Sequence, residues 1–134
     1  MTQEELKSIY LINKELEMWD KELESLREQS LMKSKQITDM PFADTGEVGD
    51  PVAELAIEIA DIELIILGKK KELMLERKKI LRYITNIPDS LDRQIVKHRC
   101  VDLMRWEDIA VAMGYERTTV SKRFNAFLRR LKAK

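Results

Sequence analysis

The chain has 134 residues, and its 24 Lys and Arg balance 24 Asp and Glu, so the formal net charge is zero. This length suits one domain or two small ones, and the scarcity of Gly (4) and Pro (3) favours long helices over a meander of short strands. No run of about 18 apolar residues is present and the first residues are polar. We therefore expect no membrane span, no signal peptide and a cytoplasmic location.

Residues that carry catalysis or hold metals are scarce. Cys100 is the only cysteine and His98 the only histidine, which excludes an internal disulfide and leaves zinc without a second pair of ligands. No phosphate-binding Gly loop or nucleophile motif is present. We expect no enzyme, no metal and no other cofactor.

The charges are distributed unevenly. Residues 1–87 hold 13 Lys and Arg against 18 Asp and Glu, whereas residues 88–134 hold 11 against 6. From Arg117 onward there are seven basic residues and no acidic one. A basic C-terminal part joined to an acidic N-terminal part indicates two functions, one of which involves a polyanion.

Residues 3–33 have the pattern of one amphipathic helix. Its apolar residues recur at alternating spacings of three and four, which is the a/d seam of a coiled coil. We expect Trp19 to be a core residue. The seam consists of Ile9, Ile12, Leu16, Trp19, Leu23 and Leu26.

Residues 34–50 contain Pro41 and two glycines, and their apolar residues show no helical periodicity. This composition predicts a loop. Asp50 then suits a helix N-cap and Pro51 the first helical position. A second long helix is predicted over 51–86, so residues 1–87 are expected to form a long helical hairpin or coiled coil. Its apolar stripe consists of Val52, Leu55, Ile59, Ile62, Ile66, Leu73 and Ile80.

Leu64, Ile65 and Leu67 make the apolar face of this second helix wider than a two-helix seam requires. One interpretation is a homodimer formed through the N-terminal helices. The alternative is a hairpin within one chain whose extra face packs on the C-terminal helices.

Residues 88–134 predict a domain of three shorter helices. The sequence "NIPDS" ends the second long helix, because the residue before a proline is pushed out of the α region. The shorter helices are expected over 89–101, 105–113 and 117–132. The whole chain is therefore predicted to be all-α.

The segment "WEDIAVAMGYERTTV" has the spacing of a helix-turn-helix. Ala110 is small enough for a second helix to approach closely, and Gly114 accepts the positive φ of a helix C-cap. Four larger side chains are expected to cover one another across the turn: Ile109, Met113, Tyr115 and Val120.

With the preceding helix included, "DSLDRQIVKHRCVDLMRWEDIAVAMGYERTTVSKRFNAFLRRL" resembles region 4 of sigma factors. The layout of the whole chain is similar to that of phage late-gene transcriptional regulators of the ArpU/RinA type, and the C-terminal third carries most of this resemblance. Arg123 departs from the helix-turn-helix pattern, because an apolar residue is expected there, and Phe124 is expected to cover the gap. The resemblance implies that Arg117, Thr118, Ser121 and Lys122 face the DNA groove.

Helix geometry places 118, 121, 122 and 125 on one face. Arg117 and Lys122 can donate to guanine, and Asn125 can pair with adenine. Trp106, at the start of the helix before the turn, is expected to pack rather than to contact DNA. The remaining basic residues are expected to meet phosphates or to stay solvated: Arg123, Arg129, Arg130 and Lys132.

The leading hypothesis is a sequence-specific transcriptional regulator that binds double-stranded DNA. Its acidic helical part would form a homodimer, contact RNA polymerase, or both. A phage small terminase subunit, which packages DNA and forms rings, is the second hypothesis. The third is a structural coiled-coil protein whose basic tail binds an acidic partner.

Overall fold

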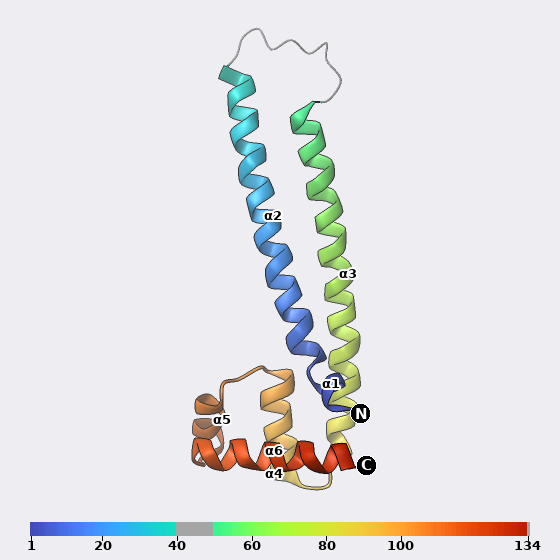
Figure 1. Ribbon diagram of the computed structural model, residues 1–134, viewed down its shortest axis with the longest axis vertical. Coiled ribbons are helices and arrows are strands. Elements are labelled where there is room, and N and C mark those ends of the chain that lie inside the picture. The colour runs from blue at the N-terminus through green and yellow to red at the C-terminus, as the bar shows by residue number, and fades with distance from the viewer. Residues whose placement is uncertain (40–49, 134) are drawn as a thin grey trace. The chain divides into compact units, whose positions relative to one another are not determined.

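The computed structural model describes residues 1–39 and 50–133. Over these residues the chain forms six α-helices and a short π-helical segment and has no strand, which confirms the predicted all-α class (Figure 1). None of the helices in this part of the chain is both long enough and apolar enough to cross a membrane.

The first long helix is interrupted near its start and continues past its expected end. Helix α1 (Gln3–Leu6) begins after Thr2, whose side chain accepts from the Glu5 amide, and α2 (Ser8–Asp39) follows a turn at Lys7. The prediction of an end at residue 33 is wrong, because residues 34–39 hold neither Gly nor Pro to stop the helix. The rest of the expected loop, residues 40–49, lies outside the described residues.

Helix α3 (Pro51–Thr85) begins and ends close to the predicted positions. Asp50 caps it: the Oδ1 atom accepts from the Val52 amide at 3.0 Å, and the carbonyl oxygen accepts from the Glu54 amide at 3.0 Å. The helix ends ahead of Pro88, as expected from the conformation that a proline imposes on the residue before it.

Residues Lys14–Lys71 form one compact unit, in which α2 and α3 lie side by side and run in opposite directions (Figure 1). The predicted seams face each other here, and Trp19 is only partly buried. Buried seam residues of this unit are Leu16, Leu23, Leu26, Leu55 and Ile66.

The second compact unit combines Met1–Asn13 with Glu72–Lys134. This grouping differs from the expected ranges 1–87 and 88–134, because apolar residues from both long helices complete the core of the C-terminal helices. A single cluster contains Leu6, Ile9, Ile80, Ile84, Ile87, Val96, Cys100, Val101 and Phe127.

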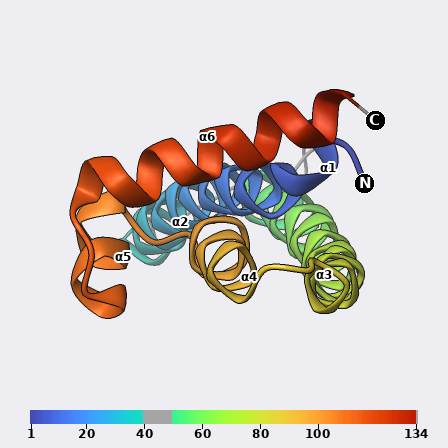
Figure 2. The same ribbon diagram turned by 90° about the horizontal axis from the view of Figure 1, so that it is seen from below.

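The C-terminal helices of this unit are α4 (Ser90–Val96), the π-helical η1 (Lys97–Val101), α5 (Trp106–Met113) and α6 (Arg117–Ala133). The helix expected over 89–101 is thus an α-helix that widens into a π-helix. Figure 2 shows α6 crossing α4, with α5 near its first turn and α1 near its last. Helix α6 contacts all three, so it is held along its whole length.

Candidate nucleic-acid interface

The turn between α5 and α6 is built around Gly114. This residue has φ 73°, in the left-handed region, as predicted. The amides of Gly114 and Tyr115 both donate to the carbonyl oxygen of Ala110, at 2.9 and 3.1 Å. These two bonds end α5 and reverse the chain, so that α6 starts at Arg117.

The side chains beneath this turn form a small core of their own. Ile109 and Val120 are completely buried, together with Ile95 of α4, and Met113 packs against them. The prediction is wrong for Tyr115, which is 47% exposed, because Ile95 rather than Tyr115 closes the cluster. The core thus joins α4, α5 and α6 into one body.

Helix α6 has an inward and an outward face. Val120 and Phe127 are buried, and three further apolar residues pack on the same cores: Phe124, Leu128 and Leu131. The predicted groove-facing positions lie on the other side. Thr118, Lys122 and Asn125 are exposed, and Ser121 is partly buried.

Arg117 lies at the first turn of α6, and its Nε is 3.2 Å from Oε1 of Glu107 on α5. Both side chains are more than half exposed, at 63% and 54%. An ion pair this exposed contributes roughly 0–1 kcal/mol, so a phosphate or a base edge can replace Glu107 at little cost.

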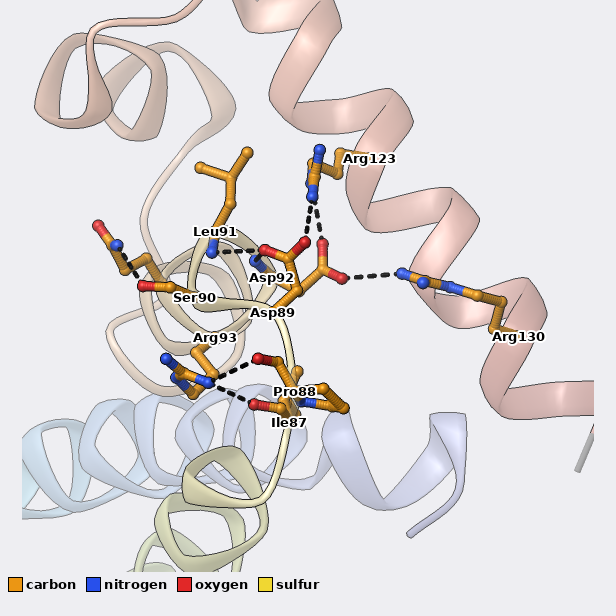
Figure 3. Close-up of polar contacts among 10 residues, drawn as sticks. Ile87, Pro88, Asp89, Ser90, Leu91, Asp92, Arg93, Arg123 and Arg130 are labelled. Atoms are coloured by element: carbon orange, nitrogen blue, oxygen red, sulfur yellow. Dashed lines mark hydrogen bonds and ion pairs between the residues drawn. The ribbon is translucent and has the colours of Figure 1, made fainter.

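Arg123 is tied to α4 instead of projecting into solvent (Figure 3). Its Nε donates to Oδ1 of Asp92 at 3.1 Å, and its Nη2 donates to Oδ2 of Asp89 at 2.6 Å. The hydrogen bond to Asp92 and the charges of both carboxylates raise the pKa of the guanidinium. The structure therefore differs from the expectation that Arg123 meets a phosphate or stays solvated. An ion pair holds α6 at the position where the pattern has an apolar residue.

The two acids on α4 have different environments. The Asp92 side chain is 4% exposed and also accepts from Nη2 of Arg130 at 2.8 Å. Asp89 is the N-cap of α4, and its Oδ1 accepts from the amide of Leu91 at 2.8 Å. This bond, the bond from the amide of Asp92 and the charge of Arg123 hold the pKa of Asp89 below its ordinary value.

Arg129 and Lys132 are exposed on α6. Nε of Arg129 donates to the carbonyl oxygen of Asn125 at 3.4 Å, within the same helix. Arg129 and Lys132 are therefore exposed on the surface of α6, whereas Arg123 and Arg130 form ion pairs with the acids at the start of α4.

Sequence reasoning missed Asp89 and Asp92 as partners of α6. The signal was present, because a charged side chain at an apolar position of the motif needs a counter-charge inside the fold. The sequence "DSLD" supplies two carboxylates three residues apart, on one face of a helix start.

Trp106 packs, as predicted. Its ring centroid is 5.3 Å from that of Phe124, and the guanidinium carbon of Arg99 lies 4.6 Å from the ring centroid. The indole therefore fills the space between α5, α6 and η1, and it supports α6 from the inward side.

Burial raises the pKa of the Cys100 thiol to about 11, so the thiol stays protonated at neutral pH. In residues 1–39 and 50–133, no three His, Cys, Asp or Glu side chains come together as metal ligands.

Comparisons with protein-family models, with curated proteins and with solved structures found no match for this chain. The resemblance to sigma-factor region 4 and to phage late-gene regulators therefore stays a prediction from the sequence.

Proposed function

We propose that the chain binds double-stranded DNA through the outward face of α6 and acts as a transcriptional regulator. One observation carries the proposal. An acid-free helix follows a tight left-handed turn, is fixed on its inner side by α4 and α5, and exposes Thr118, Lys122 and Asn125 on its outer side. A rigid helix with a polar, basic outer face suits the major groove of DNA.

The exposed side chains divide by chemistry. Lys122 can donate to the O6 and N7 atoms of guanine, and Asn125 can form a bidentate pair with adenine. Arg117 joins them when it leaves Glu107. Arg129 and Lys132 are suited to phosphates, which set the position of a protein on DNA without reading its sequence.

The class of regulator rests on the resemblance alone. It supports a sigma-factor region 4-like regulator of phage late genes that works in the host cytoplasm, and whose acidic helices form a homodimer, contact RNA polymerase, or both. A homodimer would present two copies of α6 to two half-sites, about one DNA turn apart.

The small terminase subunit is the second candidate, because it also combines a helix-turn-helix with long helices. The mass of the protein in solution separates the two. A ring of many copies favours the terminase, and a monomer or a dimer favours the regulator.

The test of the proposed interface is Lys122→Ala, measured on the site that the protein itself selects from random duplexes. We expect a loss of about 1–3 kcal/mol on that site and a much smaller loss on unrelated DNA, because Lys122 reads a base. The matched control is Lys33→Ala, which removes the same charge from an exposed position on α2. Equal losses for Lys122→Ala on selected and unrelated DNA would remove Lys122 from the reading set.

A further inference from the structure

The helix α3 carries a second apolar stripe on the side away from α2. Its members follow the same alternation of four and three residues as the buried seam, and they lie within the unit Lys14–Lys71. They are Ala53, Ile57, Ala60, Leu64 and Leu67. Ile57, Leu64 and Leu67 are 63%, 67% and 50% exposed, so the described chain leaves this stripe in contact with water.

The outer side of α2 has no comparable pattern. Its exposed large apolar residues are Tyr10, Leu11, Met18, Leu31 and Met32, and the positions that would join them into a 3-4 stripe along the outer side are polar or charged. A stripe with one apolar residue per two turns cannot interlock with a partner helix, whereas the 3-4 pattern of α3 can.

The charges along α3 indicate what covers the stripe. Residues 54–63 contain four acids and no basic residue, and residues 69–71 are three lysines. A second copy of α3 that runs in the opposite direction sets the acidic segment of each copy against the lysines of the other. A parallel copy sets like charges together.

We propose that two copies of the chain form a dimer by pairing antiparallel along this outer stripe of α3. Leu64 of one copy lies opposite Leu67 of the other, twice by symmetry, as a two-fold interface requires. In this register Glu63 faces Lys70 of the second copy, and Ala60 leaves room for the stem of Lys71, whose ammonium group reaches Asp61.

Glu63 also accepts from Nη2 of Arg27 within its own chain, at 3.1 Å. The two side chains are 50% and 59% exposed, so this pair is readily exchanged. The stripe and its flanking charges belong to one helix, and the dimer does not depend on DNA binding.

Sedimentation of the full chain tests the dimer without DNA. We expect a dimer at micromolar concentration, and a rise of at least about a hundredfold in the dissociation constant for Leu64→Glu, because both copies of the change fall at the centre of the interface. Met18→Glu, an equal change at an exposed position of α2, leaves the dimer intact. Circular dichroism checks that both variants keep their helix content. A monomeric unmodified protein, or a dimer that survives Leu64→Glu, overturns the proposal.

The orientation is tested by exchanging charges. Glu63→Lys alone and Lys70→Glu alone each weaken the dimer, by about three- to tenfold, since each sets two like charges against each other in both halves of the interface. The double variant Glu63→Lys with Lys70→Glu restores the dissociation constant. Neither position has a charged neighbour three or four residues away on α3, so the exchange leaves the helix itself unaffected. A double variant as weak as the single ones contradicts an antiparallel pair.

Disulfide trapping gives an independent readout. Chains carrying Leu64→Cys and chains carrying Leu67→Cys cross-link faster when mixed than either does alone, because these positions face each other only across an antiparallel dimer. The native Cys100 is buried and contributes little background. Faster cross-linking of each variant with itself indicates a parallel pair and overturns the proposed register.

Discussion

Asp92 shows how a single residue fixes the proposed recognition helix. Its buried carboxylate accepts from Arg123 and Arg130 of α6, at 3.1 and 2.8 Å. An amide at this position carries no charge; its oxygen can still accept from one guanidinium group, but its NH2 group faces the other. We expect Asp92→Asn to lower the free energy of unfolding by about 2–3 kcal/mol, since charged hydrogen bonds to a buried group are lost.

Urea unfolding at one protein concentration measures this effect. Asp20→Asn, at an exposed position of α2, is the control and should change stability by less than about 0.5 kcal/mol. If Asp92→Asn is as stable as the control, the ion pairs to α6 do not hold the fold together.

Asp89 makes the free energy of unfolding depend on pH in the acidic range. Its pKa in the folded chain is below the ordinary value of 3.8, chiefly because of the hydrogen bond from the Leu91 amide. Between the folded and the unfolded pKa the unfolded chain binds more protons, so the free energy of unfolding falls as the pH drops below about 4. We expect Asp89→Asn, which still caps a helix, to show a smaller acid-induced loss. Unfolding followed at pH 7 and at several pH values below 4 tests this, and an unchanged pH slope contradicts it.

The ion pairs of Arg123 could not be predicted from the sequence. The helix-turn-helix pattern has an apolar residue at this position, but Arg123 was expected to meet a phosphate or to stay solvated. Which carboxylates meet the guanidinium depends on how α4 crosses α6, and this is a tertiary relation between residues that are 31 and 34 positions apart. The local pattern indicates that Arg123 needs a counter-charge, but the packing of α4 on α6 decides which carboxylates supply it.

At the scale of the helices, Gly68 and Gly114 have opposite backbone requirements. Gly68 lies within α3, and a Cβ placed there meets no atom within 4 Å. Gly114 ends α5 at φ 73°, where any side chain is strained. We expect Gly68→Ala to stabilise the protein by about 0.5–1 kcal/mol and Gly114→Ala to destabilise it by about 1–2 kcal/mol.

Thermal or urea unfolding of both variants measures the difference. The pair controls for itself, because the chemical change is identical and only the backbone conformation differs. Two effects of the same sign would contradict the left-handed turn at Gly114 or the regular helix at Gly68.

The helix boundaries were predicted correctly where a residue with a special backbone preference marks the end of a helix. Asp50 with Pro51, Asp89 after Pro88, and Gly114 each mark an end that the structure places as predicted. The end of α2 has no such residue, and the helix continues to Asp39. The π-helical segment η1 (Lys97–Val101) also had no signal in the sequence.

At the scale of the whole molecule, the sequence predicted an all-α chain and the two seams, but not which residues share a core. Leu6, Ile9, Ile80 and Ile84 belong with the C-terminal helices rather than with a separate N-terminal hairpin. A fragment cut at residue 88 would lose these side chains, so DNA binding is properly measured on the full chain.

The central claim is that the outer face of α6 binds DNA. Fluorescence anisotropy of a labelled duplex with the full chain, over salt from about 50 to 300 mM, tests it most directly. The account predicts clear binding at low salt, with an affinity that falls linearly on a log–log plot because the basic residues release counterions. The double variant Lys122→Glu with Arg129→Glu should abolish this binding and leave the helix content unchanged. A full chain that stays folded and does not bind DNA at about 50 mM salt would contradict the account.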